Sequence, residues 1–209
     1  MRIAIIGAGN VGQALGRGWT KAGHEIVFGV PDPTPARYPK LKAEQLKLPA
    51  AAAANAAAIV LATPWDKTEA AVASLGEVSD RIIIIDCTNP LTMTPQGFGL
   101  ALGFDRSGGE RVAEWTKGAA VFKTLNQTGA ENMAEAARYA TKPAMFIAGD
   151  DSAKKRIVMQ LDSDLGFEAV DAGPLSSARL LEPLALVWID QALKRGRGRD
   201  FAFALVRRG

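Results

Sequence analysis

The chain has 209 residues, 48% of them hydrophobic, so it is long enough to bury the core of one domain. Its 25 Lys and Arg against 22 Asp and Glu leave a net charge of only +3, and the basic excess gathers near the C-terminus, which argues against a nucleic-acid partner. No apolar run approaches the roughly 20 residues of a membrane span and no signal peptide is recognisable, so we expect a cytoplasmic protein with no membrane partner.

Short, continuous apolar runs alternate with helical stretches along the chain. The runs predict strands buried on both faces of a sheet, at residues 3–6, 25–28, 59–62, 82–86, 120–125, 144–148 and, more weakly, 168–170. Between them lie predicted helices at residues 11–22, 42–57, 66–75, 129–137 and 152–165. This order predicts an α/β fold with a doubly wound, mainly parallel sheet.

The stretch GAGNVG, residues 7–12, joins the first predicted strand to the first predicted helix. In this setting Gly7 makes a tight turn, Gly9 lets the backbone approach a pyrophosphate, and Gly12 lets the helix pack on the strand. The free N–H groups at the helix start, around Asn10 and Val11, favour an anion. The stretch therefore predicts a Rossmann-type dinucleotide site, the alternative being a structural turn without a ligand.

The end of the second predicted strand bears on the choice of nucleotide. It reaches Val30 without the acidic residue that usually holds the ribose of NAD. Asp32 follows between two prolines that could turn it outward, and Arg37 and Lys40, which suit a 2′-phosphate, lie in the same loop. We therefore favour NADP, with Val30 and Arg37 in its site.

Thr63, Pro64 and Trp65 follow the predicted strand at 59–62, on the edge of the sheet where ligands bind. They are candidates for the rim of the nucleotide site. The same proline also suits the start of a helix, and the tryptophan could simply cap the core.

Two later strands also end in polar residues. Asn89 follows the strand at 82–86 and either holds a carboxamide or bonds its own turn. Lys123 and Asn126 end the strand that begins at residue 120, where a buried lysine needs a partner. Lys123 either meets a phosphate or substrate, or extends its stem to the edge of the sheet.

From residue 176 to 193, apolar residues follow a helical period that we expect Pro183 to interrupt. We predict a small helical C-terminal portion that folds back near the carboxyl ends of the strands. The apolar content of this helix favours a homodimer. No cluster of Cys and His has metal-ligand spacing, and Walker A and G-x-S-x-G motifs are absent, so no metal site is predicted.

Four further segments accompany the glycine turn: AGHEIVFG, ATPW, DCTNPL and DAGPLSSARLLEPLA, which begin at Ala22, Ala62, Asp86 and Asp171. With them, nearly the whole sequence resembles the family of coenzyme F420-dependent NADP oxidoreductases and their bacterial relatives. Where that family commonly places Ser-Arg or Val-Arg after the glycine of the second strand, this chain has Val30 and Pro31.

The resemblance implies hydride transfer between NADP and a deazaflavin (F420) or flavin-like acceptor. It implies that the nucleotide lies along the glycine turn beside Thr63, Pro64 and Trp65, with the nicotinamide near Asn89, Pro90 and Leu91. Such transfer needs positioning rather than an acid–base pair, so no catalytic side chain is predicted.

The predicted organisation is a dinucleotide-binding domain at residues 1–142 and a smaller portion at 143–209 that closes the site. Two other functions stay open at this point. One is a regulatory NAD(P)H-binding module without turnover, and the other is an imine reductase related to the pyrroline-5-carboxylate reductases. The latter family closes its site with a longer helical dimerisation domain than the residues after Pro174 provide.

Overall fold

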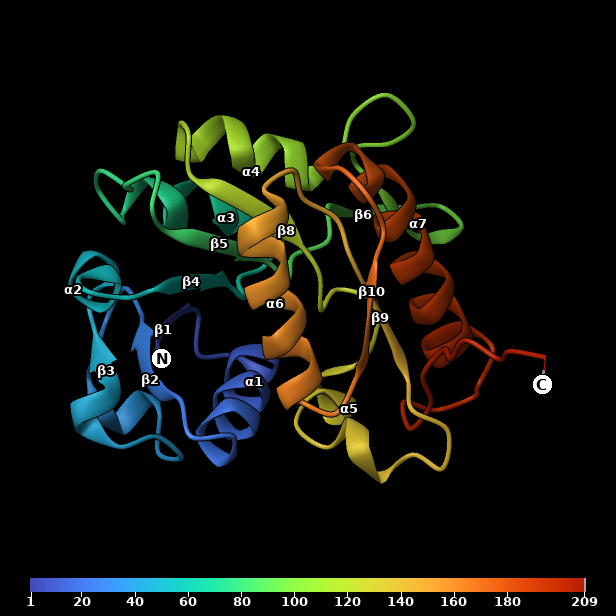
Figure 1. Cartoon of the computed structure of the whole chain (residues 1–209), viewed down its shortest axis with the longest axis horizontal. Helices are drawn as coiled ribbons and strands as arrows, with labels where there is room; N and C mark the ends of the chain where they lie inside the picture. Colours follow the sequence, from blue (N-terminus) through green and yellow to red (C-terminus); the bar gives the residue numbers. More distant parts are fainter. Residues whose placement is uncertain (209) are drawn as a thin grey trace.

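A computed structural model describes residues 1–208, and a sheet of six parallel strands forms its centre (Figure 1). In spatial order these strands are β3 (Leu46–Lys47), β2 (Glu25–Gly29), β1 (Arg2–Ile6), β4 (Ala58–Leu61), β5 (Ile83–Asp86) and β8 (Ala120–Lys123). Starting from β1, the chain adds β2 and β3 on one side and then β4, β5 and β8 on the other, which confirms the predicted Rossmann-type α/β fold.

Helices cover both faces of this sheet, because each strand is apolar on both sides. Ile3 and Ile5 of β1 pack on the face of α1 (Asn10–Lys21), α5 (Ala130–Met133) and α6 (Ser152–Asp164). Ala4 and Ile6 pack on the face of α2 (Pro49–Ala53), α3 (Trp65–Ala73) and α4 (Gly108–Thr116). No helix within residues 1–208 is both long and apolar enough to cross a membrane.

A second, two-stranded parallel sheet is formed by β9 (Ala144–Ile147) and β10 (Glu168–Asp171), which α6 connects. An antiparallel bridge between Lys123 and Ala148 joins it to β8. The Trp19 Nε1 of α1 donates a hydrogen bond of 2.9 Å to the Leu161 carbonyl of α6, so this part shares the core of the first helical face. The division of the chain after residue 142 stays a prediction.

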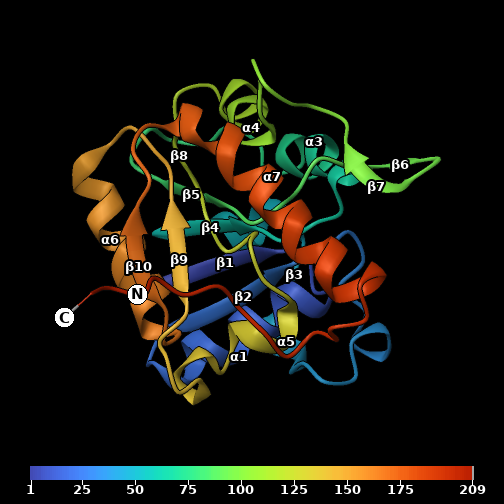
Figure 2. The ribbon, with the colours of Figure 1, turned by 90° about the vertical axis from the view of Figure 1, so that its right-hand side faces the viewer.

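The C-terminal helix α7 (Ala178–Ile189) lies across the edge of the sheet (Figure 2). A 3-10 turn, Leu175–Ser177, precedes it and a π-helical turn, Asp190–Lys194, follows it. The prediction that Pro183 interrupts this helix is wrong, since α7 continues through it. Buried anchors on both sides, Glu182 before the proline and Trp188 after it, hold the helix against the loss of one backbone hydrogen bond.

The predicted helix at 42–57 is wrong over most of its length. Its first part is a 3-10 turn, Ala43–Gln45, followed by β3, because buried Leu46 pairs with Phe28 of β2. Pro49 then restricts its preceding residue to extended backbone and starts the short helix α2.

The predicted helix at 129–137 is also shorter than expected. It consists of the four residues of α5 and a separate 3-10 turn, Ala136–Arg138. The backbone of Glu135 leaves the helical region at φ −142°, and this breaks the helix between the two pieces.

Sequence reasoning missed two elements between β5 and β8. The first is an antiparallel hairpin of β6 (Leu91–Thr94) and β7 (Gly97–Leu100). The second is α4, whose start carries a capping box in which Ser107 and Glu110 bond each other's backbone amides. The sequence SGGE at 107–110 has the spacing of that box and could have revealed the helix.

Candidate active site

Two glycines of the turn after β1 are required by the protein itself. Gly7 has φ +106°, and a Cβ there would lie 2.5 Å from the Ala62 carbonyl oxygen of the next strand. A Cβ on Gly12 would overlap the Gly7 carbonyl oxygen. These two positions therefore bring strand, turn and helix into close contact whether or not a ligand binds.

Gly9 is different, because nothing in the protein demands a glycine there. Its φ is −77°, which any residue adopts, and a Cβ would have no atom within 4 Å. Gly9 is the N-cap of α1, a position at which Ser, Thr, Asn or Asp would give a side-chain cap, yet this helix has none. The open space beside Gly9 and the uncapped start of α1 coincide.

The starts of two other helices show the contrast. The Asp151 carboxylate accepts hydrogen bonds from two backbone amides of α6, and the Glu182 carboxylate accepts from the amides of Gly108 and Gly109 in α4. Those helix dipoles are already met by anionic side chains. The first turn of α1, at Asn10 and Val11, contains no acidic residue.

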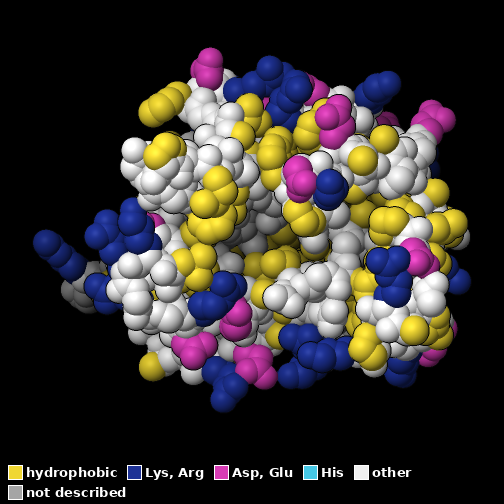
Figure 3. All heavy atoms as spheres, turned by 180° about the vertical axis from the view of Figure 1, so that it is seen from behind, with side chains coloured by type: hydrophobic (Ala, Val, Ile, Leu, Met, Phe, Trp, Pro, Cys, Tyr) yellow, Lys and Arg dark blue, Asp and Glu magenta, His cyan; other side chains and the backbone are white. Residues whose placement is uncertain are grey.

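A cavity of about 600 Å³ opens next to the glycine turn. Gly7 and Thr63 border it at the ends of β1 and β4, Pro31 borders it after β2, and Leu48 and Lys67 add walls from the flanks of α2 and α3. Seen from behind, the molecule has a hollow that hydrophobic side chains surround (Figure 3). The cavity suits a flat, largely apolar group attached to a charged one. Leu48 and Lys67 were not predicted, and no motif marks them.

The loop after β2 holds a compact polar cluster. Val30 is buried and its amide donates to the Lys47 carbonyl. The Asp32 carboxylate accepts hydrogen bonds from the Thr34 amide at 3.1 Å, the Thr34 hydroxyl at 2.6 Å and Arg37 Nη1 at 2.7 Å. The Thr34 hydroxyl, and then Arg37, lower the pKa of Asp32 to about 2. Arg37, predicted to hold a 2′-phosphate, thus has a carboxylate as its partner.

Of the residues after β4, some border the cavity and others pack between helices. The Thr63 and Thr68 hydroxyls lie 2.9 Å apart, and Thr68 also donates to the Pro64 carbonyl at 3.0 Å, which fixes the start of α3. The Trp65 ring packs against Trp115 of α4, with ring centroids 5.4 Å apart. Thr63 therefore borders the cavity, whereas Trp65 joins α3 to α4.

Lys123, at the end of β8, is completely buried. Its Nζ bonds Asp86 Oδ2 at 2.9 Å, Glu182 Oε1 at 2.9 Å and the Thr88 carbonyl at 2.6 Å. Burial by itself lowers the pKa of Lys123, but the carboxylates of Asp86 and Glu182 outweigh it and hold that pKa above its ordinary value.

The extension of the Lys123 stem to the edge of the sheet is wrong, whereas its contact with a phosphate or substrate stays a prediction. Its stem does not reach solvent at the sheet edge, and all three donors of its ammonium are used within the protein. The ion pairs instead join β5, β8 and α7. A carboxylate on the buried face of α7 supplies the partner that a lysine in an apolar strand requires.

An amide network lies next to Lys123. Asn89 Nδ2 donates to the Asn126 carbonyl at 2.9 Å, and Asn126 Nδ2 donates to Asn89 Oδ1 at 3.0 Å and to the Leu181 carbonyl of α7 at 3.2 Å. Asn89 therefore bonds a neighbouring strand end and not its own turn. Directly before Asn126, buried Leu125 has φ +58°, a strained backbone conformation for a bulky residue.

The residues after Asn89 lead from this network into the hairpin. The Leu91 amide donates to the Asn89 carbonyl at 2.8 Å, and the Pro90 carbonyl accepts from the Ala101 amide at 2.7 Å. Pro90 also lies beside Gly108, where a Cβ would meet its ring at 3.3 Å. The structure thus gathers the predicted residues of β5 and β8 at one edge of the sheet, under α7 (Figure 2).

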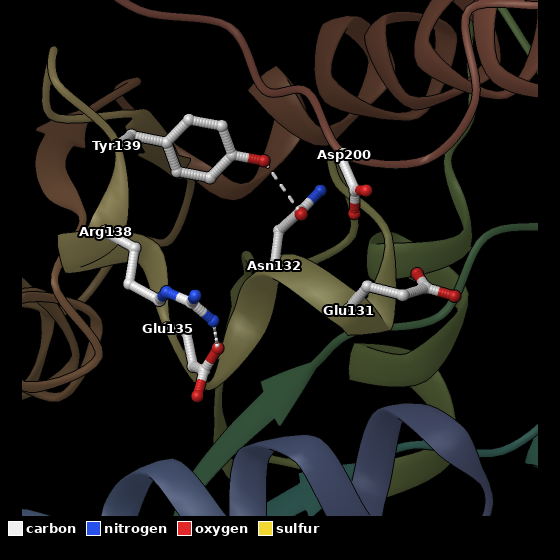
Figure 4. A pocket seen from close by; sticks show the side chains of 6 residues that line it. All are labelled: Glu131, Asn132, Glu135, Arg138, Tyr139 and Asp200. Carbon is white, nitrogen blue, oxygen red and sulfur yellow. Dashed lines mark hydrogen bonds and ion pairs between the residues drawn. The ribbon is translucent and has the colours of Figure 1, made fainter.

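A separate, polar cavity of about 280 Å³ lies between α5, the 3-10 turn after it and the C-terminal segment (Figure 4). Its side chains mostly bond one another: Tyr139 donates to Asn132 Oδ1 at 2.8 Å, and Arg138 pairs with Glu135. Asn132 also donates to the Phe201 carbonyl and so fixes the C-terminal segment. No group of His, Cys, Asp and Glu within residues 1–208 has the arrangement of a metal site.

Comparison with known proteins identifies the family of this chain. Residues 2–90 match the model of a family described as NADP oxidoreductase, coenzyme F420-dependent. The crystal structure of a candidate F420-dependent NADP-reductase from Arthrobacter sp. FB24 is 31% identical, with a TM-score of 0.89 over 99% of this chain and 100% of that one. A hypothetical protein from Sinorhizobium meliloti is 25% identical, with a TM-score of 0.72 over 100% of this chain and 96% of that one.

The fold extends to larger enzymes. A reductive aminase from Aspergillus terreus, in complex with NADPH and ethyl levulinate, is 21% identical with a TM-score of 0.65. The match covers 93% of this chain and 62% of the aminase, and at this identity it shows a common fold alone. The extended match to the Arthrobacter protein and the family model together decide the assignment. The chain belongs to the family of coenzyme F420-dependent NADP oxidoreductases and is an NADP-dependent oxidoreductase.

Proposed function

We propose that this protein binds NADP(H) along the turn after β1 and transfers hydride between its nicotinamide and a deazaflavin (F420) or flavin-like acceptor. One observation carries the proposal. Gly9 needs no glycine for folding, but it borders open space at the uncapped start of α1. A backbone free of side chains at a helix N-terminus is what a bound pyrophosphate requires.

In this proposal the residues of the turn and the cavity divide the nucleotide between them. The amides at Gly9, Asn10 and Val11 hold the pyrophosphate, assisted by the positive end of the α1 dipole. The cavity between β2 and α3 takes the adenosine, with Pro31 and Thr63 against it. Lys67 on the cavity wall places a positive charge near the phosphates.

The carboxyl ends of β5 and β8 then border the nicotinamide. The bound cofactors supply the hydride chemistry, so the task of the protein is to fix their distance and keep water out. Asn89 and Asn126 serve this by locking two strand ends to each other and to α7. Lys123 contributes to this positioning by donating a hydrogen bond to the Thr88 carbonyl. The proposal needs no side chain that gains or loses a proton.

Turnover with defined acceptors tests the proposal. The purified protein is expected to oxidise NADPH when F420 is supplied, and the absorbance of NADPH and F420 reports both partners of the reaction. FMN and FAD serve as comparison acceptors. Tight NADPH binding without reduction of any of the three would instead favour a regulatory NAD(P)H-binding module. Reduction of a cyclic imine in place of F420 would favour the imine reductase alternative.

We also propose that the protein forms a homodimer through α7. Leu180 and Val187, two turns apart on this helix, are 71% and 51% exposed, and Leu184 lies between them on the same face. Light scattering is expected to give twice the chain mass of 22.1 kDa, and Leu180→Lys together with Val187→Lys to give the single mass. A wild-type chain that is monomeric at micromolar concentration would contradict this proposal.

A further inference from the structure

In the loop between β2 and β3, the Asp32 carboxylate accepts hydrogen bonds from two other residues of the same loop. A backbone amide and a hydroxyl, both of Thr34, and the guanidinium of Arg37 converge on the Asp32 carboxylate. These three donor types are also those that bind a phosphate monoester. The donors that the Asp32 carboxylate uses are therefore of a kind that suits a phosphate group.

In the proposed function, on which this inference rests, the cluster lies beside the cavity that takes the nucleotide. Pro31, directly before Asp32, borders the cavity together with Gly7 of the glycine turn. In Rossmann-type sites an acidic residue about 20 positions after the glycines accepts from the ribose 2′-hydroxyl, whereas an arginine nearby holds a 2′-phosphate. This loop contains a residue of each kind, and the two are bonded to each other.

We infer that Asp32 is a specificity residue: it occupies the anion site of Thr34 and Arg37 and thereby lowers the preference of this protein for NADP(H) over NAD(H). A 2′-phosphate gains these donors only when Asp32 leaves them. The carboxylate that leaves stays in the same short loop, next to the incoming phosphate, and two like charges at close range repel each other.

The pair lies in solvent, with side chains 63% and 45% exposed for Arg37 and Asp32. Water and salt therefore screen it, and the fold does not depend on it. A change at Asp32 is thus expected to act on nucleotide choice and not on folding. Since its pKa is about 2, protonation does not remove the carboxylate charge at neutral pH.

The test is a titration of NADPH and of NADH into the whole protein and into Asp32→Asn. We expect the ratio of NADPH to NADH affinity to rise about tenfold, through tighter NADPH binding, which is the size of one charge-assisted hydrogen bond. Adding Arg37→Ala to Asp32→Asn should abolish the gain. The matched control is Asp190→Asn, which breaks another exposed Asp–Arg pair, with Arg195 at 2.9 Å, and should leave the ratio as it is.

Three results would overturn the inference: an unchanged ratio in Asp32→Asn, a ratio that rises only because NADH binds more weakly, or a gain that survives Arg37→Ala. The second would show that Asp32 binds the ribose hydroxyls instead. A wild-type protein that binds neither nucleotide would be a failure of the proposed function, and it is distinguished by the absence of any titration signal before Asp32 is changed.

Discussion

Replacing Lys123 by methionine is expected to lower the free energy of unfolding by about 3–5 kcal/mol, the usual cost of removing one partner from a buried ion pair. The substitution leaves the carboxylates of Asp86 and Glu182 without their shared cation, both inside the protein. It also removes the hydrogen bond to the Thr88 carbonyl. Urea denaturation of the variant and the wild type measures the difference.

Lys21→Met is the matched control for this experiment. Lys21 pairs with Glu135 at 3.9 Å, and both side chains are exposed (71% and 44%), so its loss should cost about 1 kcal/mol or less. Changing Glu182 to Gln in the Lys123→Met background should recover part of the loss, because one of the two buried charges is then removed. A Lys123→Met protein as stable as the control would refute the assigned role of the ammonium.

Asp162→Asn is expected to stabilise the protein, by an amount that grows with pH. Asp162 is fully buried in α6, accepts one hydrogen bond from the Thr124 hydroxyl at 2.7 Å, and its Oδ1 has no hydrogen-bond partner among residues 1–208. Burial raises the pKa of Asp162 from its ordinary value of 3.8 to about 8. The folded state therefore keeps a proton that the unfolded chain loses.

The sign of the pH dependence follows from this difference. As the pH rises from about 4 to about 8, the unfolded chain is increasingly favoured by ionisation, and the wild type loses on the order of a few kcal/mol. Asparagine cannot ionise, so the variant escapes the loss. Urea denaturation at pH 5 and pH 8 should show a larger advantage of Asp162→Asn at pH 8, whereas exposed Asp80→Asn should show none. An equal advantage at both values would rule out this account of Asp162.

The parts of the fold that depend on local sequence were predictable. The apolar strands were predicted correctly because both faces of the parallel sheet are covered. The tight turn from strand to helix was predicted correctly because Gly7 and Gly12 leave no room for a Cβ. The prediction of a helix over 42–57 was wrong because the helix propensity of its alanine-rich part concealed the pairing of Leu46 with β2. The prediction that Pro183 interrupts α7 was wrong because the buried residues Glu182 and Trp188 hold the helix in place and outweigh the local effect of the proline.

The predicted site residues divide in the same way. That Lys123 needs a partner followed from its apolar strand, but its partners come from β5 and α7, and Glu182 is 59 positions away along the chain (182 − 123). The pairing of Arg37 with Asp32 is local, yet the sequence alone does not show whether the loop brings them together. Propensity and spacing carry no information on such side-chain geometry.

The most direct test of the account is the affinity for NADPH of Gly9→Val beside that of the wild type. The Cβ of a valine at Gly9 has no protein atom within 4 Å and the backbone there is extended, so the protein should fold, at a cost of about 1 kcal/mol for the loss of glycine at an N-cap. The valine would fill the space where the pyrophosphate meets the start of α1, and the affinity should fall about 100-fold, the value of two charge-assisted hydrogen bonds. Gly103→Val, at another glycine with open space and no positive φ, should bind as the wild type does. A folded Gly9→Val protein that binds NADPH as tightly as the wild type would contradict the central claim.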